Sequence, residues 1–228
     1  METLLVPIHR AGWPFIALFA GVTFILFLLS QTLGMLGLAL TGWCIYFFRN
    51  PKRVTPLGEG LIISPGDGMV TKIEKAIPPK ELKWLKTPLT RVSIFLNVFD
   101  VHVNRIPVEG VITKIHYHPG KFFNASLDKA SQHNERNSII VKTPSDQEVL
   151  VVQIAGLIAR RILCEVKEGQ EMNAGETFGI IRFGSRVDLY LPEGIFPQVI
   201  EGQRMIGGET IIGDLRSSAP QRIGKIYP

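Results

Sequence analysis

A ten-residue stretch that occurs twice decides the fold of this chain. Residues 168–177 read EGQEMNAGET and residues 201–210 read EGQRMIGGET, so seven of the ten positions are identical. A second unit is repeated as well: GMVTKI at residues 68–73 recurs as GVITKI at 110–115 and, more loosely, as GLIARRI at 156–162. Short apolar-alternating runs that begin at glycine and recur along a chain predict repeated strands and turns.

The pattern after residue 50 is that of a β domain. Runs such as Val92–Leu96 and Ile139–Lys142 are interrupted by many of the 22 glycines and 15 prolines of the chain. The repeated units resemble lipoyl- and biotinyl-type β-sandwiches, in which glycine permits positive φ at sharp corners. We therefore predict a mainly β, barrel-sandwich-like domain of repeated strand units over residues 51–228. Such repeats build a fold and need carry no chemistry.

This resemblance also supplies a rival function, a membrane-tethered lipoyl/biotinyl-like sandwich module without catalysis. A carrier of that type needs an exposed, modifiable lysine at a hairpin tip, typically beside methionine. The chain contains no Met-Lys pair, which weakens the carrier hypothesis.

The first 50 residues are of a different kind. The 38 residues between Arg10 and Arg49 include no Asp, Glu, Lys or Arg. The sequence SQTLG at residues 30–34 divides this gap into two apolar runs, 13–29 and 35–48, each shorter than the ~20 residues that an upright membrane crossing requires. Because positive charge flanks both ends, we predict a membrane-anchoring helical hairpin whose two ends face the cytoplasm.

The uncharged gap admits two other interpretations. A cleaved signal peptide is disfavoured because the apolar stretch is over twice a normal h-region and no A-x-A site follows it. A single tilted span, with the domain outside the cytoplasm, stays open. The composition as a whole excludes a disordered chain, a coiled coil and a polytopic transporter. The net charge of +5 favours an anionic membrane surface as a partner, and we expect no nucleic acid.

Gly184-Ser185, between the two EGQ repeats, is the candidate cleavage site. In a strained turn, a serine hydroxyl can attack the preceding carbonyl and convert the amide into an ester. Elimination then leaves a dehydroalanine, which hydrolyses to a pyruvoyl group. Glycine leaves the attacked carbonyl unobstructed, and a base must activate the hydroxyl. The plain alternative is a bulge between two strands.

Six motifs, in this order and spacing, give the chain its resemblance to phosphatidylserine decarboxylase proenzymes of the short, membrane-anchored bacterial type. They are FFRNP (47–51), SPGDG (64–68), FDVHVNRIP (99–107), PGKFFN (119–124), NERN (134–137) and FGS (183–185). The resemblance implies that the proenzyme divides between Gly184 and Ser185 into chains 1–184 and 185–228. Ser185 would thereby become a covalent pyruvoyl group, with no external cofactor.

The resemblance also implies roles for three further residues. Asp67 would orient or assist the base of self-cleavage. His102, which without its motif would be an ordinary strand histidine, is our choice for that base and for the later protonation. Arg105 stands where the family's longer bacterial form has a second histidine, so the identity of the base stays open. We assign Arg105 to the phosphate or carboxylate of the substrate, which its guanidinium fork suits.

Three weaker candidates for substrate binding are Asn134, Arg136 and His118. Glu135 and Arg136 could equally form a surface ion pair of little energetic worth. His116 and His118 alternate, which places both imidazoles on one strand face, but no third ligand is evident nearby and we predict no metal site.

The expected function is decarboxylation of phosphatidylserine to phosphatidylethanolamine and CO2, with the pyruvoyl group as electron sink. A decarboxylase of ether-linked serine lipids is an alternative within the same chemistry. The expected partners are phosphatidylserine in the membrane and the two chains of one proenzyme, and a homodimer is left open. The expected location is the inner membrane, with the catalytic domain on its cytoplasmic face.

Overall fold

The computed structural model describes residues 6–123, 133–156, 161–182 and 184–224. The chain divides into two compact units, Met1–Lys52 and Arg53–Pro228. Each unit is described by itself below.

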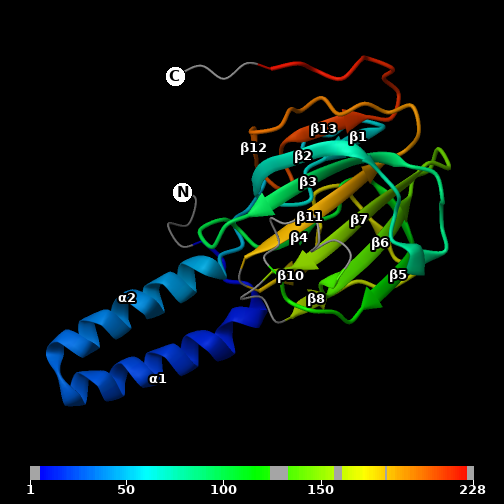
Figure 1. The fold of residues 1–228 in the computed structure, drawn as a ribbon. Coiled ribbons are helices and arrows are strands. Elements are labelled where there is room, and N and C mark those ends of the chain that lie inside the picture. Colours follow the sequence, from blue (N-terminus) through cyan, green and yellow to red (C-terminus); the bar gives the residue numbers. More distant parts are fainter. Residues whose placement is uncertain (1–5, 124–132, 157–160, 183, 225–228) are drawn as a thin grey trace. The chain divides into compact units, whose positions relative to one another are not determined.

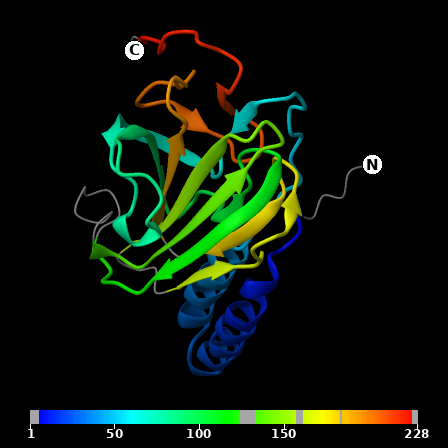
Figure 2. The ribbon, with the colours of Figure 1, turned by 90° about the vertical axis from the view of Figure 1, so that its right-hand side faces the viewer.

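The N-terminal unit is an antiparallel pair of helices that lie side by side (Figures 1 and 2). After the short helix η1 (Arg10–Gly12), α1 spans Trp13–Leu29 and α2 spans Gln31–Phe47. The predicted hairpin of two apolar helices is therefore present. Its break is confined to Ser30, which is extended with φ −164° and ψ 137°, so α2 begins four residues earlier than the apolar pattern indicates.

Small residues bring the two helices close together. A Cβ atom at Gly34 would lie 2.1 Å from the ring of Phe27. The hydroxyls of Thr23 and Thr41 are 2.9 Å apart, and Thr41 also donates to the carbonyl of Gly37 over 2.9 Å. Small and hydroxyl side chains at a close helix contact are typical of helix pairs in lipid.

The outward faces of this pair are apolar and exposed, as at Phe24 and Leu28, which are 66% and 71% exposed. Residues Arg10–Leu29 are long and apolar enough to cross a membrane, judged by length and composition, whereas α2 is shorter. Because exposed apolar surface is unfavourable in water, this unit is suited to association with a membrane.

The second unit is built almost entirely from strands. They are β1 (Leu61–Ile63), β2 (Gly68–Ala76), β3 (Leu89–Leu96), β4 (Val103–Arg105), β5 (Gly110–His118), β6 (Arg136–Lys142), β7 (Glu148–Ala155), β8 (Ile162–Cys164), β9 (Glu171–Met172), β10 (Thr177–Ile181), β11 (Ser185–Leu191), β12 (Arg204–Met205) and β13 (Ile211–Asp214), with a short helix η2 (Lys80–Leu82).

These strands form one large sheet and two small ones. The large sheet has the order β12-β2-β3-β11-β7-β6-β5-β9, and its central strands lie side by side in Figure 1. The small sheets are β4-β10-β8 and β1-β13, and the strand pairs in all three sheets are antiparallel. The large sheet is approximately symmetric. The pair β2-β3 lies on one side of the central strands β11 and β7, and the equivalent pair β6-β5 lies on the other side. The prediction of a mainly β domain is confirmed, while the likeness to lipoyl-type sandwiches stays a prediction.

The sequence repeats account for this symmetry. The carboxylate of Glu201 accepts a hydrogen bond from the amide of Ile73 over 2.7 Å, and Glu168 accepts one from Ile115 over the same distance. A β-bulge interrupts β2 and β5 at the same place in both copies. Each EGQ turn therefore ties down the strand that begins with the repeated glycine. The looser third copy at 156–162 lies partly outside the described residues.

The central strands of the large sheet, β3, β11, β7 and β6, are buried on both faces, and each face packs against a separate apolar cluster. Val187 and Leu189 of β11 belong to the main apolar cluster, whereas Tyr190 belongs to a second cluster on the opposite face. Because side chains alternate along a strand, Ser185 shares the face of Val187, while Arg186 lies on the face of Tyr190.

Candidate active site

Ser185 lies where the chain crosses from one sheet to another. Strand β10 belongs to the three-stranded sheet, and Ser185 begins β11 of the large sheet, opposite Leu96 of β3 and Ala155 of β7. Phe183 of the FGS motif lies outside the described residues. Ser185 is fully buried, and among the described residues its hydroxyl has no hydrogen-bond partner. The hydroxyl is therefore not committed to a structural contact.

Gly184 provides the conformation that this crossing requires. Its φ is +66°, in the left-handed region that residues other than glycine adopt only at a cost in conformational energy. A Cβ atom there would meet nothing within 4 Å, so the backbone conformation, and not crowding, is what favours glycine.

His102 is fully buried and contacts the cleavage site directly. Its Nε2 accepts a hydrogen bond from the amide of Gly184 over 3.1 Å, and its Nδ1 lies 3.0 Å from the carbonyl oxygen of Asp100. Because Nε2 is the acceptor of an N–H group, the ring proton belongs on Nδ1, which donates to Asp100. The basic lone pair of the imidazole therefore points at the residue that precedes Ser185. Sequence reasoning did not identify Asp100 as the group that orients this ring, although it lies within the FDVHVNRIP motif.

The Asp67 carboxylate is bound by Arg53 and by a backbone amide. In the part of the chain that the structure describes, its carboxylate accepts two hydrogen bonds from Arg53, over 2.9 and 2.7 Å, and one from the amide of Gly207 over 2.8 Å. Burial raises the pKa of Asp67 above its ordinary value, although Arg53 and the Gly207 amide lower it. Asp67 thus joins the SPGDG turn to Arg53, a partner that the sequence pattern did not indicate.

Arg105 lies beside this ion pair. Its Nη1 donates to the carbonyl of Gly175 over 2.8 Å. Burial lowers the pKa of Arg105, and the neighbouring Arg53 guanidinium lowers it further. Two guanidinium groups thus lie near each other, and the carboxylates of Asp67 and Glu209 act on Arg105 in the opposite direction.

Asn134 is brought close to Ser185 through the backbone. Its fully buried side chain donates to the carbonyls of Ala155 and Phe123, over 2.8 and 2.7 Å, and accepts from the amide of Phe123 over 2.9 Å. Ala155 is the cross-strand partner of Ser185. Asn134 therefore fixes the end of β7 beside the serine. Asn124, the last residue of the PGKFFN motif, lies outside the described residues.

The structure does not bring Arg136 and His118 to Ser185. These two residues are opposite each other on β6 and β5, on the face of the sheet that carries Tyr190. Arg136 is 5% exposed and pairs with Glu81 in place of a surface pair with Glu135. It lines a hollow of about 700 Å³ on that face.

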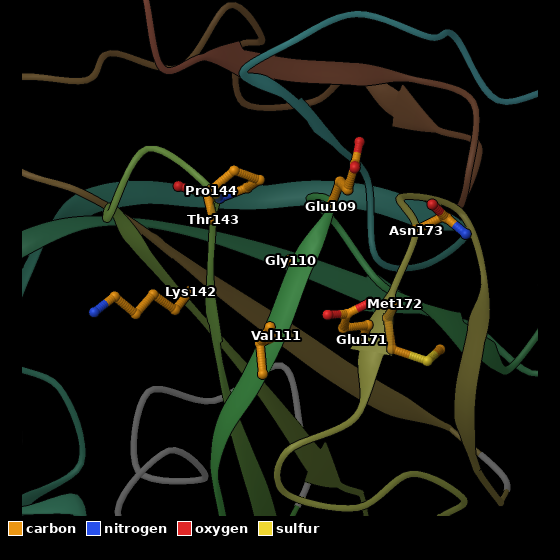
Figure 3. A pocket seen from close by; sticks show the side chains of 9 residues that line it. All are labelled: Glu109, Gly110, Val111, Lys142, Thr143, Pro144, Glu171, Met172 and Asn173. Carbon is orange, nitrogen blue, oxygen red and sulfur yellow. The ribbon is translucent and has the colours of Figure 1, made fainter.

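A separate hollow of about 690 Å³ lies at the β5–β9 edge and is lined by the residues labelled in Figure 3. Glu109 there holds the position that Asp67 holds in the other repeat, because each directly precedes the repeated glycine. None of the predicted site residues lines this hollow. Across the described ranges, no group of three or more His, Cys, Asp or Glu side chains is placed to hold a metal ion.

A buried serine follows a left-handed glycine, and an oriented imidazole accepts a hydrogen bond from the amide of that glycine, an arrangement suited to a self-processing proenzyme. The family model described as phosphatidylserine decarboxylase matches residues 40–213. The chain belongs to this family.

Full-length relatives agree with this assignment. The chain is 56% identical to the phosphatidylserine decarboxylase proenzyme of Cereibacter sphaeroides, over 98% of this chain and 97% of that protein. It is 55% identical to the proenzyme of the same name from Ruegeria pomeroyi, over 94% and 98%. It is 57% identical to that from Rickettsia akari, over 91% and 90%.

Proposed function

We propose that this protein decarboxylates phosphatidylserine to phosphatidylethanolamine and CO2, and that it makes the required pyruvoyl group from its own Ser185. The observation that carries the proposal is the hydrogen bond from the Gly184 amide to Nε2 of His102. It places an oriented base at Gly184, the residue whose carbonyl carbon Ser185 must attack. Family membership supports the overall reaction.

The first step is an attack of the Ser185 hydroxyl on the carbonyl carbon of Gly184. A new C–O bond forms, the hydroxyl proton passes to Nε2 of His102, and the carbonyl electron pair moves onto its oxygen. To accept this proton, Nε2 must exchange the Gly184 amide for the hydroxyl of the next residue. The Asp100 carbonyl stabilises the resulting imidazolium through Nδ1. Collapse of the oxyanion breaks the C–N bond, the Ser185 nitrogen takes a proton, and an ester remains.

The second step removes the proton from Cα of Ser185. The Cβ–Oγ bond breaks, and residues 1–184 leave with the former ester as the C-terminal carboxylate of Gly184. Water hydrolyses the remaining dehydroalanine, ammonia departs, and a ketone is left at the start of residues 185–228. When formed, that pyruvoyl ketone supplies an electron sink for the electrons that CO2 leaves behind. His102 remains at this place to return a proton to the product.

The charge around Asp67 supports binding of an anionic headgroup. The Arg53 guanidinium lies close enough to disfavour the charge of Arg105, and the carboxylates of Asp67 and Glu209 partly compensate it. A phosphate or carboxylate beside Arg105 would relieve that repulsion, and the guanidinium fork matches either group. The net charge of +5 further favours a membrane with anionic lipids.

Self-cleavage is tested on a denaturing gel of freshly purified protein. The wild type should divide into chains 1–184 and 185–228, the smaller with a blocked N-terminus, and should form phosphatidylethanolamine from phosphatidylserine vesicles. Ser185→Ala should remain one inactive chain. Ser138→Ala is the matched control, because Ser138 is equally buried but lies on the other face of the sheet. An intact wild-type chain would refute the proposal.

We further propose that the helix pair holds the domain at the cytoplasmic face of the inner membrane. The uncharged stretch between Arg10 and Arg49, with its exposed apolar helix faces, supports this placement. Protease added to right-side-out vesicles should leave the β domain intact, and protease added to inverted vesicles should digest it. Digestion from the outside would place the domain on the opposite side.

A further inference from the structure

Three buried amide side chains form a directional chain that ends next to the cleavage site. Asn137 donates through Nδ2 to Oε1 of Gln153 over 3.0 Å, and Gln153 donates through Nε2 to Oδ1 of Asn104 over 2.8 Å. The three residues are 2%, 0% and 0% exposed. Because each amide accepts from the one before it, Asn104 is left with its Nδ2 as the final donor. Within the described residues this Nδ2 has no partner.

The sheet register places this donor on the reactive side of the domain. Gln153 is opposite Val187, two residues along β11 from Ser185, so Gln153 and Ser185 share one face. Asn104 follows His102 by two residues in an extended segment, which directs both side chains to the same side.

The glycine of the SPGDG turn locates the Nδ2 atom more closely. A Cβ atom on Gly66 would lie 3.3 Å from Nδ2 of Asn104 and 3.5 Å from the side chain of Leu96. Leu96 is the cross-strand partner of Ser185. The unpartnered donor therefore lies between the turn that carries Asp67 and the strand that faces the serine.

A buried donor without an acceptor destabilises the folded state, because its lost hydration is not replaced by a hydrogen bond. Such a group, held by two further amides near reacting atoms, is suited to an acceptor that forms only during the reaction. Asn104 and Ser185 are both fully buried in the uncleaved chain, so before cleavage the acceptor for this donor is an oxygen of the chain itself. The oxygen that gains charge at this place is the carbonyl oxygen of Gly184.

We propose that Nδ2 of Asn104 donates a hydrogen bond to the Gly184 carbonyl oxygen as Ser185 attacks it, and so stabilises the oxyanion of self-cleavage. The assignment rests on the proposed self-cleavage at Ser185. No proton is transferred by Asn104, whose amide only neutralises charge that moves from the carbonyl bond onto its oxygen.

The test compares Asn104→Leu with Asn137→Leu in the full-length chain. Each variant removes one buried amide and one hydrogen bond to Gln153, but only the first removes the final donor. The rate of self-cleavage is followed by pulse-labelled cell-free synthesis and gel analysis. Removal of a single oxyanion donor lowers rates by roughly 10²–10³-fold in other enzymes, so Asn104→Leu should cleave at least about tenfold more slowly. Asn137→Leu should stay within about threefold of wild type at a similar melting temperature.

The remaining outcomes all bear on the assignment. Equal slowing of the two variants would overturn it in favour of a purely structural network. Normal cleavage of Asn104→Leu with a raised KM for phosphatidylserine vesicles would overturn it in favour of a donor to the substrate. Slow cleavage with wild-type kcat and KM per processed molecule supports it. If the wild-type chain is not cleaved, both the proposed function and the assignment of Asn104 are refuted. If the wild type is cleaved and Asn104→Leu is cleaved at the same rate, only the assignment of Asn104 is refuted.

Discussion

The amide of Gly184 donates a hydrogen bond to Nε2 of His102 over 3.1 Å, between residues that are 82 positions apart in the chain. This contact joins the end of the three-stranded sheet to the first residue before β11. It selects the imidazole tautomer with the proton on Nδ1, because the Asp100 carbonyl is available to accept there. The base of the proposed self-cleavage is thus oriented before any substrate arrives.

His102→Gln should abolish self-cleavage or slow it by at least about 100-fold, because general-base catalysis typically contributes 10²–10⁴-fold and glutamine cannot accept the proton. His116→Gln is the control, since His116 lies opposite Ser138 on the other face of the sheet. The proportion of cleaved chain is measured on denaturing gels over time. Cleavage of His102→Gln at the wild-type rate would exclude His102 as the base.

Gly184→Ala should slow self-cleavage while the protein remains folded. The new methyl group meets nothing within 4 Å, so the expected cost is the strain of a positive φ, roughly 1–2 kcal/mol, together with a shifted carbonyl. Gly194→Ala is matched, because Gly194 has φ +81° and equally open surroundings away from the site. Melting temperatures should fall by similar amounts in both variants, and only Gly184→Ala should accumulate uncleaved chain. Equal cleavage rates would show that the conformation at residue 184 does not matter for the attack.

Asp67→Asn should slow self-cleavage by roughly tenfold, because it removes the charge that holds Arg53 against the SPGDG turn. Its counterpart in the other repeat, Glu109, is exposed, so Glu109→Gln should cleave normally. Pulse–chase gels of the two variants measure the difference. If Asp67→Asn and Glu109→Gln cleave alike, the carboxylate has no part in processing.

Tyr190 should make the domain sensitive to alkaline pH. Burial, and then the nearby Asp188, raise the pKa of Tyr190 to about 12 from 10. Because the pKa of Tyr190 is higher in the folded state than in the unfolded state, its contribution to the free energy of unfolding is fully present below pH 10. This contribution is lost as the pH rises through about 12. Two pKa units correspond to about 3 kcal/mol of unfolding free energy.

Urea unfolding at a series of pH values measures this loss. Tyr190→Phe should flatten the decline above pH 10, whereas a substitution of the exposed Tyr117 by Phe should keep most of the wild-type slope. If the free energy of unfolding of Tyr190→Phe declines above pH 10 as steeply as that of the wild type, other titrating groups cause the decline.

The sequence by itself predicted the two kinds of unit and the candidate cleavage site. Glycines at 68 and 110 and glutamates at 168 and 201 recur at equivalent positions of two repeated units, and this repetition was sufficient to predict repeated β units. The uncharged stretch before Arg49 likewise predicted an apolar helix pair, because helix formation there depends on composition. Gly184, Ser185 and His102 were identified from motifs whose chemistry is specific to those residue types.

Only the tertiary structure decided which side chains meet. The sequence did not distinguish three pocket candidates, Asn134, Arg136 and His118. Strand register places Arg136 and His118 on the face of the sheet opposite Ser185, whereas Asn134 binds the carbonyl of Ala155, the partner of Ser185. Because side chains alternate with a period of two, the face of each residue is fixed by pairing between strands, which a local pattern does not contain. The links of Asn104 to Gln153 and of Asp67 to Arg53 likewise join separate segments, and they exist only once the sheets have assembled.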